Sequence, residues 1–127
     1  MWDDSHVTTR LLIVDDHAGF RRFARKLLEA AGYDVVGDAA DGASALAAVE
    51  HLDPDVVLLD VLLPDTTGFE VARTLSLRGH DRPVVVLTSS RTESDFGERA
   101  TTSAARGFIS KSELTVATLA ALLGEAA

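Results

Sequence analysis

The chain has 127 residues, of which 46% are hydrophobic and 25% charged, so one domain with a real hydrophobic core is expected rather than a disordered chain. Its formal net charge of −8 argues against a broad nucleic-acid-binding surface, and the absence of cysteine excludes disulfides and thiolate metal sites. No apolar run approaches the roughly 18 residues that a membrane span needs.

The first residues are acidic and lack the basic and then apolar pattern of a signal peptide, so a cytoplasmic protein without membrane contact is expected. Residues 1–9 are predicted to form a short disordered tail and residues 10–124 to form the domain. A group of basic residues in the first predicted helix forms either a local patch or a solvated helix face, and the second interpretation is favoured. The group comprises Arg21, Arg22, Arg25 and Lys26.

Three short apolar runs each stop at a polar residue. They are rich in β-branched residues, as is typical of strands buried on both faces of a parallel sheet. The runs cover residues 11–14, 56–59 and 84–87, and they stop at Asp15, Asp60 and Thr88 respectively. Residues 33–36 and 107–109 are weaker strand candidates.

Segments with helical periodicity lie between these runs. The first carries apolar residues at helical spacing from Phe20 to Ala31, and Gly32 ends it. Further helices are predicted around residues 45–49, 69–75 and 116–123, the last with Ser112 as its N-cap. A fourth helix is expected within residues 94–105, although Gly97 and residues 101–103 are poor helix formers.

Five strands, each followed by a helix, predict a parallel sheet covered by helices on both faces. The carboxyl ends of parallel strands meet at one edge of such a sheet, where ligands bind. Polar side chains follow four of the strands, so we expect them to converge at this edge. They are Asp15, Asp16, Asp60, Thr88, Ser89, Ser90 and Lys111.

These residue types suit phosphoryl chemistry. Clustered carboxylates repel one another unless a cation joins them, and oxygen ligands without cysteine favour Mg²⁺. A hydroxyl, an ammonium group and a divalent ion together can stabilise a phosphoryl group, and a carboxylate can itself be the nucleophile.

The sequence resembles the receiver domain of two-component response regulators over residues 10–124. Single motifs are weak, but all four occur in order and at family-like spacing. The matching stretches are residues 12–17 (LIVDDH), 55–68 (DVVLLDVLLPDTTG), 83–90 (PVVVLTSS) and 105–111 (ARGFISK).

The resemblance implies the metal and phosphoryl roles residue by residue. Asp60 matches the phosphoacceptor. Asp16 matches the direct Mg²⁺ ligand, and Asp15 the carboxylate that acts mainly through water. The backbone carbonyl of Leu62 matches a further metal ligand, and Lys111 the lysine that pairs with a phosphoryl oxygen.

The resemblance also implies a conformational switch. Thr88 matches the switch hydroxyl, and Phe108 the aromatic residue whose ring turns inward when the threonine moves. The stretch from Thr88 to Lys111 is one residue longer than in chemotaxis-type members, so Ser89 remains a rival for the switch hydroxyl. Phe108 also lacks the hydroxyl that tyrosine would carry.

The family fold is α/β and flavodoxin-like, a (βα)5 three-layer sandwich around a five-stranded parallel sheet of order 2-1-3-4-5. The implied function is a phosphorylatable signalling switch of a two-component phosphorelay. A histidine kinase or phosphotransfer protein is the expected phosphoryl donor, and Mg²⁺ the expected cofactor. The domain is expected to promote its own phosphotransfer and slow dephosphorylation rather than to act as an enzyme on other substrates.

Phosphorylation is expected to change the face formed by helix 4, strand 5 and helix 5, which would contact an output domain or a second copy of the chain. Direct nucleic-acid binding by this domain is not expected. Ser112 stands where many relatives have proline, and Ala104 where glycine is usual. Together with the Asp-Asp-His motif, Ser112 resembles receivers that precede LuxR-type helix-turn-helix outputs.

Two other functions remain open at this point. A phosphatase with a carboxylate nucleophile would need an acid–base carboxylate two residues after Asp60, and Leu62 disfavours it. A degenerate receiver would be only an interaction module, which the complete acceptor set disfavours. His17 is either a metal or acid–base residue or a solvent-facing residue at a helix start, and the second interpretation is favoured. Residues 65–68 are interpreted as a turn with an N-cap rather than a second metal site.

Overall fold

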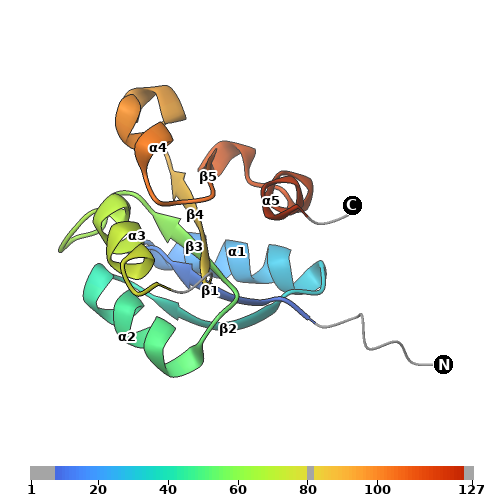
Figure 1. Ribbon diagram of the computed structural model, residues 1–127. Coiled ribbons are helices and arrows are strands. Elements are labelled where there is room, and N and C mark those ends of the chain that lie inside the picture. Colours follow the sequence, from blue (N-terminus) through green and yellow to red (C-terminus); the bar gives the residue numbers. More distant parts are fainter. Residues whose placement is uncertain (1–7, 80–81, 125–127) are drawn as a thin grey trace.

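The computed structural model describes residues 8–79 and 82–124, so most of the predicted tail lies outside the described residues. Five parallel strands form one sheet in the order β2-β1-β3-β4-β5, which confirms the predicted fold (Figure 1). The strands are β1 Arg10–Val14, β2 Asp34–Ala39, β3 Val56–Asp60, β4 Val84–Ser89 and β5 Gly107–Ser110.

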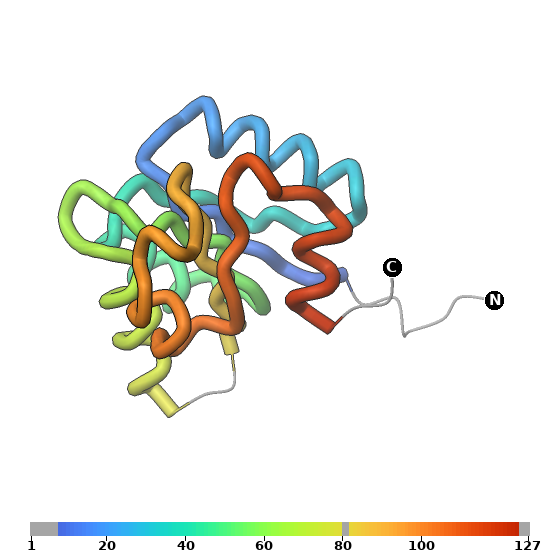
Figure 2. The backbone as a smooth tube through the Cα atoms, turned by 90° about the horizontal axis from the view of Figure 1, so that it is seen from above, coloured from blue at the N-terminus to red at the C-terminus, as the bar shows by residue number. Residues whose placement is uncertain are grey.

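The helices cover both faces of this sheet, so the domain has three layers (Figure 2). The α-helices are α1 Ala18–Ala30, α2 Gly42–Leu52, α3 Gly68–Ser76, α4 Glu98–Thr102 and α5 Val116–Leu123. Two short 3-10 helices, η1 Glu93–Phe96 and η2 Lys111–Glu113, precede α4 and α5. Among the described residues, no helix is long and apolar enough to cross a membrane.

The core divides at the sheet because successive residues of a strand point to opposite faces. Leu11 and Ile13 of β1 pack in the cluster that α1 and α5 cover. Leu12 and Val14 pack in the cluster on the side of α2 and α3. The same alternation decides which polar residue at a strand end points to which side of the sheet.

The fourth helix lies within the predicted residues 94–105, and it is short, as the poor helix formers there indicate. α4 has only five residues, and it follows Gly97, whose φ is 59°. The hydroxyls of Thr101 and Thr102 donate to the carbonyl oxygen of Glu98 at 3.1 and 2.7 Å, and Ser103 is extended. Residues that bond their own backbone in this way compete with helix extension, which explains the early end.

Two details of the predicted helices are wrong. Thr115 rather than Ser112 caps α5, because its hydroxyl accepts a hydrogen bond from the N–H of Thr118 at 3.1 Å, while Ser112 lies in η2. Phe23, assigned to the apolar stripe of α1, has a 52% exposed side chain.

The loop after β3 is fixed to its surroundings. Asp65 accepts hydrogen bonds from the N–H groups of Gly42 and Ala43 at 2.8 and 3.0 Å, and these bonds lower the pKa of its carboxyl. Thr67 caps α3, as the predicted turn with an N-cap requires. A Cβ at Gly68 would lie 2.6 Å from the carbonyl oxygen of Asp60, so only glycine allows α3 to begin this close to β3.

Candidate functional site

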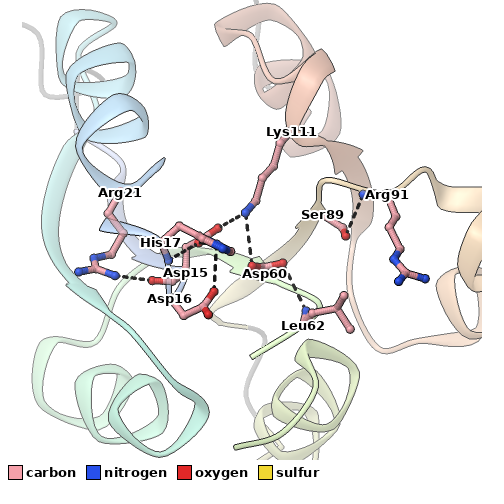
Figure 3. A network of polar contacts seen from close by, with 9 residues as sticks. All are labelled: Asp15, Asp16, His17, Arg21, Asp60, Leu62, Ser89, Arg91 and Lys111. Atoms are coloured by element: carbon pink, nitrogen blue, oxygen red, sulfur yellow. Dashed lines mark hydrogen bonds and ion pairs between the residues drawn. The ribbon is translucent and has the colours of Figure 1, made fainter. Parts of the chain in front are cut away.

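Part of the predicted polar set meets at the carboxyl edge of the sheet, where Asp15, Asp60 and Lys111 point toward one another (Figure 3). Ser90 is exposed and no contact joins it to this group among the described residues. Asp15 follows β1, Asp60 ends β3, Thr88 lies in β4 and Lys111 follows β5. Asp60 pairs with Thr88 in the register of β3 and β4. By the alternation along each strand, all four side chains are on the side of the sheet that α1 and α5 cover. The tertiary structure thus brings together residues that are up to almost a hundred positions apart.

Lys111 joins the two buried carboxylates. Its Nζ atom lies 2.6 Å from Oδ2 of Asp15 and 3.4 Å from Oδ2 of Asp60. Asp15 is fully buried, Asp60 is almost fully buried, and the Lys111 side chain is 16% exposed. Since charges that leave water are costly without a partner, this ammonium is what allows two carboxylates in one pocket.

The pKa of Asp60 is raised from 3.8 to about 6. Burial is the main cause, and the negative charge of Asp15 adds to it. The Lys111 ammonium and the N–H of Leu62, which donates to Oδ1 of Asp60 at 3.3 Å, oppose part of this rise. Asp60 is therefore mostly ionised at pH 7, and it is a more basic oxygen nucleophile than an ordinary aspartate.

Thr88 and Ser89 differ in direction and in bonding. Thr88 Oγ1 is buried and has no hydrogen-bond partner among the described residues, which is uncommon for a buried hydroxyl. Ser89 follows Thr88 in β4 and therefore points to the other side of the sheet. Its Oγ accepts a hydrogen bond from the N–H of Arg91 at 3.1 Å.

Three consecutive side chains after β1 and one at the end of β3 form a group that fits a metal ion. One ligand atom each of Asp15, Asp16, His17 and Asp60 lies within 4.8 Å of the others. Three of these ligands are carboxylates, the donors that Mg²⁺ prefers, and Asp16 is partly exposed, so an ion can approach from solvent. The donor set therefore fits the magnesium ion that the sequence predicts.

His17 is the exposed residue at the start of α1 that the sequence favours, and it also belongs to this group, as the alternative metal or acid–base interpretation allows. Its side chain is 70% exposed, yet Nδ1 lies 3.1 Å from Oδ1 of both Asp15 and Asp16. Its backbone N–H also donates to Oδ1 of Asp15 at 2.8 Å. The adjacency of histidine to two aspartates was the available signal, but the orientation of the ring depends on the start of α1.

Of the other two residues to which the resemblance assigns a role, Leu62 lies beside Asp60 and Phe108 lies away from it. The Leu62 side chain is 46% exposed beside Asp60. Phe108 is not in the polar group, because it lies on the opposite side of the sheet and pairs with Leu87. Its ring centroid is 5.8 Å from that of Phe96 in η1.

Comparison with known proteins identifies the family. Residues 11–123 match the model of the response regulator receiver domain. The DNA-binding transcriptional activator EvgA of Escherichia coli K12 is 31% identical over 102 residues, which are 80% of this chain and 50% of EvgA. The chain spans about half the length of several curated relatives that it matches.

Solved structures agree with this match. A LuxR-family two-component response regulator from Aurantimonas sp. SI85-9A1 is 31% identical, with a TM-score of 0.80 and coverage of 94% of this chain and 88% of that chain. The chemotaxis response regulator CheY4 of Vibrio cholerae is 27% identical, with a TM-score of 0.78 and coverage of 93% and 98%.

The chain belongs to the response regulator receiver domain family. It is a phosphorylatable signalling domain of a two-component system, a class that binds Mg²⁺ in an acidic pocket and works with histidine kinases and output domains. The predicted resemblance to receivers of LuxR-type regulators is confirmed.

Proposed function

We propose that Asp60 is the phosphoacceptor of this receiver domain and that a histidine kinase or phosphotransfer protein is its donor. One observation carries the proposal: the nearly buried Asp60 carboxylate lies 3.4 Å from the Lys111 ammonium, and Asp60 is the register partner of Thr88, whose buried hydroxyl has no partner among the described residues. Phosphoryl transfer needs a nucleophile, a cation and a hydroxyl donor in this arrangement.

The transfer itself balances simply. An Asp60 carboxylate oxygen attacks the phosphorus of a phosphohistidine, a P–O bond forms, and the P–N bond to the donor imidazole breaks. The imidazole keeps the electron pair and takes up a proton. Lys111 neutralises charge on the phosphoryl oxygens, and the Thr88 hydroxyl donates a hydrogen bond to one of them.

A Mg²⁺ ion would be held by Asp15, Asp16, Asp60 and the backbone carbonyl of Leu62. When bound, it supplies charge neutralisation to the phosphoryl oxygens and to the clustered carboxylates. Asp16 is the expected direct ligand because it is the partly exposed carboxylate. Asp15 is already engaged by Lys111 and by the N–H of His17, which fits an indirect role.

The switch is proposed to run from Thr88 to Phe108. The buried Thr88 hydroxyl gains a partner when a phosphoryl group is present, which draws in the loop after β4 and changes the packing of Phe108. Since the Phe108 ring touches Phe96 of η1, the change would reach α4, β5 and α5. This face would contact an output domain or a second copy of the chain. Ser89 is disfavoured as the switch hydroxyl, because it points to the other side of the sheet.

The assignment is tested by incubating the protein with a small phosphodonor and Mg²⁺ and measuring acid-labile phosphate. The wild type and an Asp34→Asn control, which alters an exposed carboxylate at the start of β2, should both be labelled. Asp60→Asn should keep its fold and acquire no label. Labelling of the Asn variant at the wild-type rate would show that Asp60 is not the acceptor.

The switch is tested by NMR. Chemical shifts are compared between the apo protein and a complex with Mg²⁺ and beryllofluoride, a stable analogue of the aspartyl phosphate. Changes are expected to spread from Asp15, Asp16 and Asp60 to residues 88–116. Changes confined to the acidic pocket would contradict the coupling between Thr88 and Phe108.

A further inference from the structure

The ring of Phe20 lies against the ammonium group that serves the site. Lys111 Nζ is 4.6 Å from the centroid of the Phe20 ring, within the range of a cation–π contact. Phe20 belongs to α1 and is partly buried against the core cluster that α1 and α5 cover. Besides the two carboxylates, Lys111 therefore has a third contact, from an aromatic face.

The backbone of β5 decides to which side of the sheet the Lys111 side chain points, but it does not fix where the ammonium ends. Lys111 begins the three-residue helix η2, and the hydrogen bond from the N–H of Leu114 to its carbonyl oxygen is long, at 3.4 Å. Four flexible carbon atoms separate the ammonium from this backbone, and fixing them costs conformational entropy. The position of Nζ is thus decided by what it touches: Asp15, Asp60 and Phe20.

Only one of these three contacts is independent of the reaction. When a phosphoryl group is added to Asp60, the carboxylate becomes an acyl phosphate and the negative charge moves to the phosphoryl oxygens. The attraction between Asp60 and Lys111 therefore changes during the reaction. The oxygens of Asp15 belong to the group that fits a metal ion. The quadrupole of the Phe20 ring does not change in either event, and the Lys111 side chain is only 16% exposed, which strengthens a cation–π contact.

We propose that Phe20 is a positioning residue for Lys111, holding the ammonium where it meets the phosphoryl oxygens before and after transfer. The inference rests on the proposed role of Asp60 as phosphoacceptor. It assigns to the first apolar position of α1 a function beyond its packing in the core.

The matched variants separate this role from packing. Phe20→Leu keeps an apolar side chain and removes the aromatic face, whereas Phe20→Tyr keeps the face. Phe23→Leu is the control, since Phe23 lies on the same helix with its ring 6.1 Å from that of Phe20 and with a 52% exposed side chain. Thermal unfolding of each variant establishes that it is folded.

Two readouts are measured. The first is kcat/KM for labelling by a small phosphodonor with Mg²⁺. Phe20→Leu should lose about tenfold, as expected for a largely desolvated cation–π contact, while Phe20→Tyr and Phe23→Leu stay within about twofold of the wild type. The second is the NMR shift of the Lys111 ε-protons, which a ring face moves upfield. This shift should be present in the apo and beryllofluoride states of the wild type and absent in Phe20→Leu.

Equal rates for Phe20→Leu and the wild type would overturn the proposal, as would equal losses in Phe20→Leu and Phe20→Tyr. A normal Lys111 ε-proton shift in the wild type would overturn it as well. These outcomes differ from a failure of the proposed function, in which Asp60→Asn is still labelled at the wild-type rate.

Discussion

Replacing Asp60 by asparagine is expected to stabilise the metal-free protein. In the folded state, burial and the nearby charge of Asp15 make ionisation of this carboxyl less favourable, and its pKa rises from 3.8 to about 6. Each pKa unit corresponds to about 1.4 kcal/mol, so the ionised carboxylate lowers the free energy of unfolding at pH 7 by at most about 3 kcal/mol. Asparagine has no charge to bury. The raised pKa already includes the opposing attraction of Lys111, so a net gain of up to about 3 kcal/mol is expected.

The pH dependence gives the sharper test. The folded-state pKa of this acid is raised, so the folded protein binds more protons than the unfolded chain between pH 3.8 and about 6. The wild type therefore recovers stability relative to Asp60→Asn as the pH falls through 6. The difference in free energy of unfolding between Asp60→Asn and the wild type should be largest above pH 6 and should disappear below pH 3.8.

Urea unfolding without divalent ions, at pH 7.5, 6.0 and 5.0, measures this difference directly. The matched control is Asp34→Asn, which alters an exposed carboxylate at the start of β2 and should change stability little at any pH. A less stable Asp60→Asn variant at pH 7.5, or a difference that is the same at pH 7.5 and 5.0, would refute the electrostatic explanation of the site.

Four further outcomes are expected. Calorimetry should show a larger loss of Mg²⁺ affinity in Asp16→Ala than in Asp15→Ala, because Asp16 is the exposed carboxylate, and equal losses would contradict this order. Decay of acid-labile phosphate should be faster in Leu62→Asn, since an amide can orient the attacking water and leucine cannot; an unchanged or longer half-life would count against it. Gly68→Ala should lower the free energy of unfolding by roughly 1–3 kcal/mol, because its Cβ would lie 2.6 Å from the Asp60 carbonyl oxygen, and urea unfolding checks this. Without divalent ions, the NMR signal of the Asp60 side-chain carboxyl carbon should titrate with a raised pKa of about 6, and a midpoint near 3.8 would contradict the effect of burial.

The sequence pattern predicted the alternation of strands and helices and most of the polar side chains at the sheet edge, and the family resemblance supplied the strand order. Short apolar runs rich in β-branched residues are typical of strands buried on both faces of a sheet, and their alternation with helices favours a parallel sheet and leaves few topologies. The end of each run then marks the sheet edge, which is why Asp15, Asp60, Thr88 and Lys111 were predicted as one group. These features depend on local composition and on spacing, and both are visible in the chain.

The tertiary structure decided how these side chains meet. That Thr88 rather than Ser89 faces Asp60 depends on the register of β3 and β4. That His17 turns toward two aspartates depends on where α1 begins. That Phe20 meets Lys111 depends on how α1 packs on the sheet near the end of β5. The early end of α4 follows from hydroxyls that bond their own backbone.

Local pattern determines which residues lie at the sheet edge, because burial and periodicity act over a few positions. Distances of a few ångströms between residues almost a hundred positions apart are set by the packing of whole elements, as with Lys111 and its contacts to Asp15 and Phe20. The raised pKa of Asp60 arises from the same packing, since burial and the neighbouring charge of Asp15 exist only once β1 and β3 lie side by side.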